Sequence, residues 1–94
     1  MGAVSVVTKE GKLAGIFTDG DLRRQMRKMG DHILTATVEE CMTSNAISID
    51  ANAMLQRATE IFNTNQVDNI IVTEKGKPIG MLDIQDLVNL DLLG

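Results

Sequence analysis

GIFTDGD, residues 15–21, is the stretch of this 94-residue sequence that decides its fold. An apolar run ends at Phe17, and Thr18 stands where a helix can begin. A threonine at an N-cap accepts a hydrogen bond from a backbone N–H two or three residues on. Asp21 completes the Ser/Thr-x-x-Asp/Glu capping pattern. The stretch therefore predicts a strand that passes directly into a helix over roughly Asp19–Met29.

The stretch belongs to an internal repeat, which is the first organisation to look for in a chain. Residues 6–25 align with residues 71–90 at an offset of 65, and seven of the 20 positions are identical. The second copy of the stretch reads GMLDIQD, residues 80–86. The identical pairs are Val7/Val72, Thr8/Thr73, Gly11/Gly76, Lys12/Lys77, Gly15/Gly80, Asp21/Asp86 and Leu22/Leu87.

Each copy has the pattern of a β-hairpin followed by a helix. Two short apolar runs flank a charged turn that contains a glycine, which is typical of a hairpin. The helix of the second copy is expected over Ile84–Leu92. The four expected strands are Ala3–Thr8 and Leu13–Phe17 in the first copy, and Asn69–Thr73 and Ile79–Leu82 in the second.

Between the copies the sequence predicts a linker, a helical turn, a strand and a helix. Gly30–Thr37 has the composition of a linker, and Val38–Met42 is expected to form a short helical turn. Ala46–Ile49 alternates as a strand does, with Ile47 and Ile49 on one face. Apolar residues then follow the spacing of an amphipathic helix. They are Met54, Leu55, Ala58, Ile61 and Phe62.

These elements predict an α+β fold with two unequal units. The second unit reads β-α-β-β-α, whereas the first reads only β-β-α. We therefore expect a partial first unit with its linker over residues 1–36, and a complete second unit over residues 37–94. The chain is short enough for its core to be modest.

The composition indicates the cellular compartment and argues against some classes of partner. No run of about 18 apolar residues occurs, and the N-terminus has no signal-peptide pattern. The single cysteine, Cys41, cannot form an internal disulfide, so the cytoplasm is the expected compartment. The net charge of −4 and the two aromatic residues argue against nucleic acid as a partner.

A repeated β-α-β-β-α unit with G-h-h-T-x-x-D at its last strand–helix junction resembles the CBS domain. Cys41-Met42-Thr43 also resembles the start of a unit in that family. The string GIFTDGDLRR, residues 15–24, is similar to the CBS pair at the C-terminus of bacterial arabinose-5-phosphate isomerases. Those enzymes act on the route to Kdo and lipopolysaccharide, and their active site lies in a separate sugar-isomerase (SIS) domain. The resemblance thus implies a regulatory module without a catalytic centre of its own.

The resemblance implies a ligand site at the two junctions. In the family, the residues matching Thr18 and Asp21 bind the phosphate and the ribose diol of a nucleotide. The implied effector is an adenine nucleotide, or cytidine-linked Kdo as a downstream product. Capping alone also explains both residues, and the sequence leaves the two readings open. The candidate ligand-binding residues are Thr18, Asp21, Asp83, Asp86, Thr43 and Asn45.

The two junctions are not expected to be equivalent. Asp83 stands where Thr18 stands, and it is a good N-cap. A carboxylate beside a phosphate nevertheless places like charge against like, although Asp86 can still hold a diol. The basic residues Arg23, Arg24, Arg27 and Lys28 in the first helix suit its C-terminal dipole, and an anionic ligand is the alternative.

Two isolated side chains, His32 and Cys41, are not expected to form functional sites. His32 is alone in a polar linker, whereas a metal site needs several ligands. Cys41 is expected to be buried rather than nucleophilic. Because the first unit lacks an opening strand and helix, we expect the chain to associate as a dimer or higher oligomer, as the resembled family does. A purely structural oligomerisation module remains the alternative to ligand sensing.

Overall fold

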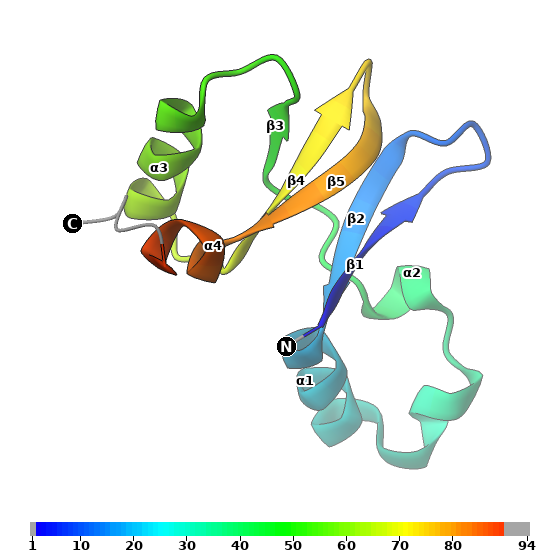
Figure 1. Cartoon of the computed structure of the whole chain (residues 1–94). Coiled ribbons are helices and arrows are strands. Elements are labelled where there is room, and N and C mark those ends of the chain that lie inside the picture. Colours follow the sequence, from blue (N-terminus) through cyan, green and yellow to red (C-terminus); the bar gives the residue numbers. More distant parts are fainter. Residues whose placement is uncertain (1, 90–94) are drawn as a thin grey trace. The chain divides into compact units, whose positions relative to one another are not determined.

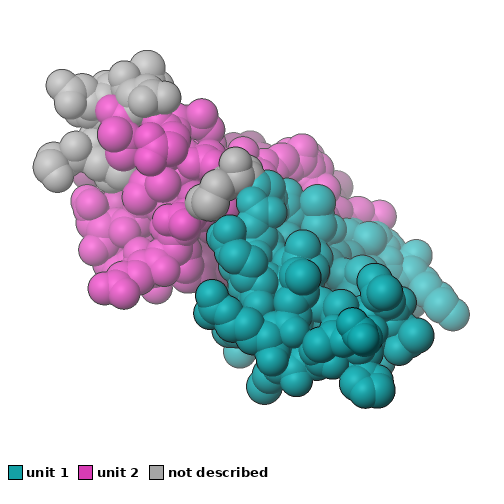
Figure 2. Space-filling view, turned by 90° about the horizontal axis from the view of Figure 1, so that it is seen from below, with its two compact units in different colours: residues 1–46 teal, residues 47–94 magenta. Residues whose placement is uncertain are grey.

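The computed structural model describes residues 2–89 of the chain, and it places them in two compact units. Unit 1 comprises residues 1–46 and unit 2 residues 47–94, as Figure 2 shows in two colours. The repeat-based boundary between residues 36 and 37 remains a prediction. The compact units divide later in the chain because the segment at Thr43 pairs with a strand of unit 1.

Unit 1 consists of a hairpin and the helices that follow it (Figure 1). Strand β1 (Ala3–Val7) pairs antiparallel with β2 (Leu13–Thr18), and helix α1 (Asp19–Met29) follows without a loop. A 3-10 helix, η1 (Gly30–Thr35), and the short α2 (Val38–Cys41) complete the unit. The predicted hairpin and α1 are confirmed, whereas the predicted linker is largely helical.

As far as residue 89, unit 2 consists of a three-stranded sheet and two helices. Its strands have the order β3-β4-β5, in which β3 is parallel to β4 and β5 antiparallel. The parallel pair requires a crossover, and α3 supplies it. The elements are β3 (Ser48–Asp50), α3 (Leu55–Thr64), β4 (Asn69–Glu74), β5 (Lys77–Asp83) and α4 (Ile84–Asn89). The predicted β-α-β-β-α order is confirmed.

The core of unit 2 joins one face of this sheet to both helices. The alternation of side chains along a strand places Ile70 and Val72 on the same face of β4. Helices α3 and α4 contribute the apolar side chains that cover this face, and burial of these side chains is the main stabilising term. The buried cluster consists of Ile49, Ala58, Ile61, Phe62, Ile70 and Leu87.

The apolar stripe of α3 begins later than the sequence predicts. Met54 is the N-cap and is 75% exposed, and Leu55 is also exposed. Only Ala58, Ile61 and Phe62 are buried. The predicted strand at Ala46–Ile49 shifts to Ser48–Asp50, although the Ile71 N–H still bonds the Ile47 carbonyl at 3.1 Å. Residues 90–92 of the predicted last helix lie outside the described residues.

The two hairpins differ in their turns, and this difference corrects part of the repeat alignment. In unit 1 the Thr8 N–H bonds the Lys12 carbonyl at 2.8 Å around a three-residue turn that ends in Gly11, whose φ is 83°. In unit 2 a two-residue turn, Lys75-Gly76, joins the strands, with φ values of 53° and 80°. Two-residue hairpin turns whose central residues have positive φ favour glycine at those positions.

The different turn lengths shift β1 by one residue relative to β4 when the two hairpins are compared. Gly15 faces Val6, whereas Gly80 faces Val72. The structural counterpart of Val72 is therefore Val6 and not Val7. The identities Val7/Val72 and Thr8/Thr73 do not mark equivalent positions, whereas Gly15/Gly80 and Asp21/Asp86 do.

Candidate functional site

The first strand–helix junction forms the predicted capping box. The Thr18 hydroxyl accepts the Asp21 N–H at 3.1 Å, and the Asp21 carboxylate accepts the Thr18 N–H at 2.9 Å. These bonds satisfy backbone N–H groups that a helix start leaves without partners. The local sequence therefore suffices to begin α1 at Asp19.

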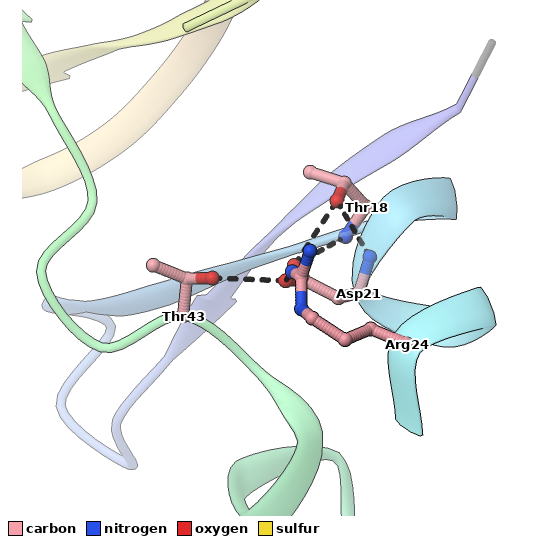
Figure 3. Close-up of polar contacts among 4 residues, drawn as sticks. All are labelled: Thr18, Asp21, Arg24 and Thr43. Carbon is pink, nitrogen blue, oxygen red and sulfur yellow. Dashed lines mark hydrogen bonds and ion pairs between the residues drawn. The ribbon is translucent and has the colours of Figure 1, made fainter. Parts of the chain in front are cut away.

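The Asp21 carboxylate is buried and accepts from four donors (Figure 3). Its side chain is buried although its residue type is seldom found inside proteins without partners. Oδ2 accepts from the Thr18 backbone and from the Thr18 hydroxyl at 3.1 Å. Oδ1 accepts from the Thr43 hydroxyl at 2.9 Å and from Arg24 Nη2 at 2.5 Å. Each carboxylate oxygen thus has two donors.

Thr43 reaches Asp21 because the chain runs beside β2 at this point. The Ile16 N–H bonds the Thr43 carbonyl at 2.9 Å, and the Thr43 N–H bonds the Ile16 carbonyl at 2.8 Å. Gly15 makes this approach possible. A Cβ on Gly15 would lie 2.6 Å from the Thr43 carbonyl oxygen and 2.7 Å from Met42 Sδ.

The surroundings of Asp21 set the charge of its carboxyl group. Burial by itself would raise the pKa, because it disfavours the charged form. The hydrogen bonds donated by Thr18, Thr43 and Arg24 outweigh burial and hold the pKa of Asp21 below its ordinary value. The junction therefore holds a stable, ionised carboxylate.

The second junction repeats the capping without this enclosure. Asp83 accepts the Gln85 N–H at 2.8 Å, and Asp86 accepts the Asp83 N–H at 3.3 Å. The Asp86 side chain is exposed. Asp83 therefore caps α4 as predicted, and two carboxylates stand together where unit 1 has a hydroxyl and a carboxylate.

The structure brings three of the six predicted site residues together. Thr18, Asp21 and Thr43 share one hydrogen-bonded network in unit 1, whereas Asp83 and Asp86 lie in unit 2. Asn45 is exposed and makes none of the described hydrogen bonds. Sequence reasoning missed that Arg24 binds Asp21. The spacing of the two residues, i and i+3 on one helix, is the signal that could have indicated it.

A pocket and two single side chains in the described chain do not add to this site. An open, largely apolar pocket of about 160 Å³ lies in unit 2 and contains none of the predicted site residues. Cys41 is buried and His32 is exposed. Among residues 2–89 no three metal-ligating side chains come together, and no helix is long and apolar enough to cross a bilayer.

Comparison with known sequences relates the chain to one family. The sequence profile of the CBS domain matches residues 1–28 and 38–92. Arabinose 5-phosphate isomerase KdsD of Pseudomonas aeruginosa is 32% identical over 94 residues, which are 99% of this chain and 28% of that protein. The KpsF isomerase of Escherichia coli O6:H1 is 38% identical over 86 residues, 90% of this chain and 26% of that protein. The chain thus spans about a quarter of the length of these relatives.

Solved structures show the same fold. The CBS-domain protein ATU1752 of Agrobacterium tumefaciens superposes with a TM-score of 0.81 at 30% identity, covering 97% of this chain and 72% of that one. The CBS domain pair of MJ0100, in complex with 5′-methylthioadenosine and S-adenosyl-L-methionine, gives 0.79 at 21% identity over 95% and 68%. CBSX2 in complex with AMP gives 0.75 at 21% over 96% and 70%.

Proposed function

The chain belongs to the CBS domain family, and from that membership we propose that it is the ligand-sensing module of an arabinose-5-phosphate isomerase. Its relatives KdsD and KpsF support the choice of parent enzyme. The active site of the parent enzyme would lie in a SIS domain outside these residues. The parent would be a cytoplasmic enzyme on the route to Kdo and lipopolysaccharide. The module would have a small-molecule effector and further copies of itself as partners.

The partly buried network around Asp21 is the observation that carries the proposal. It places a hydroxyl, an ionised carboxylate and an exposed guanidinium at the start of α1, which has 11 residues. A helix start favours a phosphate, and a carboxylate favours a diol. We therefore propose a nucleotide or nucleotide-sugar as effector, either an adenine nucleotide or cytidine-linked Kdo. The adenosine ligands of MJ0100 and CBSX2 support the first choice.

The network also defines what a ligand has to do. Both oxygens of Asp21 are occupied, so a diol can bind there only after a donor leaves. Arg24 is the donor that leaves most easily, because its side chain is 64% exposed and exposed ion pairs contribute little. A released guanidinium suits a phosphate, to which it can make bidentate hydrogen bonds.

Calorimetry with a ligand panel tests the proposal. The panel holds AMP, ATP, S-adenosyl-L-methionine and cytidine-linked Kdo, titrated into the 94-residue chain. Loss of a charged hydrogen bond removes about 1.5–3 kcal/mol, so Asp21→Asn should weaken binding about tenfold or more. Asp86→Asn is the matched control in unit 2 and should change little, as should Asp83→Thr.

The outcomes separate folding from binding. Circular dichroism checks that Asp21→Asn is folded, and Thr43→Val supplies a second variant that removes one donor from the same carboxylate. Equal weakening by Asp21→Asn and Asp86→Asn would contradict a site at the first junction. Native mass spectrometry of a freshly purified full-length parent would identify a nucleotide that co-purifies.

Two observations favour a second function, a structural oligomerisation module. The four donors of Asp21 satisfy it within the chain, so no ligand is needed to explain its burial. Large apolar side chains are also exposed, among them Val4 at 56% and Leu34 at 87%. This function predicts no heat with any panel member, together with a dimer or larger species in sedimentation at micromolar concentration. A cooperative monomer would contradict it.

A further inference from the structure

Gly80 is a glycine that nothing in the described chain requires. It lies inside β5, which is the edge strand of its sheet among the described residues, and it is exposed. Its φ is not among the positive values, and a Cβ built on it would meet nothing nearer than Val72 Cβ at 4.0 Å. A glycine inside a strand weakens the strand and often marks the close approach of another backbone.

The equivalent glycine in unit 1 shows such an approach. Gly15 is buried because Met42 and Thr43 run along the edge of β2, and Thr43 pairs with Ile16. A Cβ on Gly15 would lie 2.6 Å from the Thr43 carbonyl oxygen. The repeat places Gly80 and Met81 at the positions of Gly15 and Ile16. The edge of β5 can therefore accept a segment as the edge of β2 does, but no described segment pairs with it.

The backbone of β5 presents the right groups at this edge. Backbone groups of residues two apart on a strand point to the same side. In unit 1 the Ile16 N–H bonds Thr43, and the Thr18 N–H, on the same side, bonds Asp21. In unit 2 the Asp83 N–H bonds the Asp86 carboxylate. The N–H and C=O of Met81 therefore point away from β4, toward the open edge.

We propose that the edge of β5 at Gly80-Met81 binds an extended polypeptide segment in which a flexible apolar side chain precedes a threonine or serine. Met42-Thr43 is the template for this chemistry, and the segment would add to the sheet as one short antiparallel bridge. Strand addition of this kind uses main-chain hydrogen bonds for affinity and side-chain pockets for specificity. This interaction is independent of any ligand at Asp21.

The occupant that we propose is polypeptide from outside residues 1–94. Each chain has one Met42-Thr43 segment but two strand edges that can pair with such a segment, one at Gly15 and one at Gly80. If two copies exchanged this segment, each chain would still have one strand edge without a paired segment. The relatives are about four times as long as the match, as the 26–28% coverage shows, so they contain polypeptide that could supply such a segment.

Nuclear magnetic resonance on the 94-residue chain tests the proposal. The chain has six methionines, so selective ¹⁵N-methionine labelling gives few signals, among them that of Met81. The probe is a synthetic peptide of residues 38–46 that carries Cys41→Ser. Addition of the peptide should shift the Met81 amide signal and slow its hydrogen exchange.

Three controls sharpen the result. Gly80→Ala should weaken the peptide at least tenfold, because a Cβ there would meet the incoming backbone as it would at Gly15. Gly20→Ala makes the same chemical change in unit 1, where the Cβ would have an ordinary 3.6 Å contact, and should leave binding unchanged. A peptide N-methylated at the threonine lacks the N–H that donates to the Met81 carbonyl and should not bind.

The remaining outcomes overturn the proposal. Equal binding by the Gly80→Ala variant would place the peptide elsewhere, and no shift of Met81 at millimolar peptide would leave the edge without this function. Protection of the Met81 amide that rises with protein concentration, without peptide, would show that a second copy is the occupant. Loss of ligand binding at Asp21 would not affect any of these readings.

Discussion

The two strand–helix junctions occupy the same place in the repeat but differ in what surrounds them. At the first, Asp21 is 3% exposed and holds four donors; at the second, Asp86 is exposed and accepts one bond of 3.3 Å. Both junctions start a helix, because capping depends on residues within one turn. One of the four donors at the first junction is Thr43, which lies 22 residues away from Asp21 in the chain. The two copies of the motif thus share the cap, whereas only the first has the enclosed carboxylate.

The largest expected difference concerns the two aspartates. Asp21→Ala leaves the donors of four partly buried hydrogen bonds without their acceptor and should lower the free energy of unfolding by about 2–4 kcal/mol. Asp86→Ala removes one long bond at an exposed cap and should lower it by about 1 kcal/mol or less. Urea unfolding of both variants measures the two values. Similar losses would show that the junctions are energetically alike.

Local signals explain what could be predicted from the sequence. Helix α1 begins and ends where the sequence predicts, because Thr18 and Asp21 cap one end and Gly30 follows the other. The hairpins also followed from their glycine-containing turns. The one-residue difference between β1 and β4 could not be predicted, because it depends on the turns having three residues in one hairpin and two in the other.

Two further features could not be predicted from the sequence. Met54 and Leu55 fit the periodic stripe of α3, but the helix starts only after Met54, and both side chains remain exposed. The contact of Thr43 with Asp21 depends on the chain returning to β2 after η1 and α2. Neither residue type nor spacing indicates such a return.

The two glycines give the next largest difference. Gly15→Ala forces a Cβ against a backbone oxygen at 2.6 Å and should lower the free energy of unfolding by about 1–3 kcal/mol. Gly80→Ala meets no atom nearer than 4.0 Å and should raise it by up to about 1 kcal/mol, since alanine limits the unfolded chain more than glycine does. Thermal melts of both variants compare them. Equal destabilisation would mean that β5 already has an occupant at its edge.

Acidification should affect the first junction through Asp21. Its pKa in the folded chain lies below the unfolded value of 3.8, so its ionised form stabilises the fold at higher pH. This stabilisation is fully present above the unfolded pKa and is lost as the pH falls through the folded pKa. The effect is smaller than deletion of the side chain, because burial opposes the hydrogen bonds.

Asp21→Asn isolates this contribution. The free energy of unfolding, measured by urea denaturation from pH 7 down to pH 3, should fall more steeply for the wild type than for Asp21→Asn. Asp86→Asn removes a carboxylate from the second junction and serves as the matched substitution for comparison. Parallel curves for the wild type and Asp21→Asn would show that the carboxylate is not preferentially ionised in the folded chain.

The smallest expected effect is that of Arg24, which has no cationic counterpart in the repeat because Asn89 stands at its position in unit 2. The Arg24 side chain is 64% exposed, so solvent and salt screen its attraction to Asp21. Arg24→Gln should therefore lower the free energy of unfolding by about 1 kcal/mol or less. Urea unfolding at low and high salt measures this, and the difference from wild type should shrink as salt rises. A salt-independent loss of about 2 kcal/mol or more would show that the pair behaves as a buried one. Displacement of Arg24 by a diol would then be unfavourable, and the network around Asp21 would favour the structural function over ligand sensing.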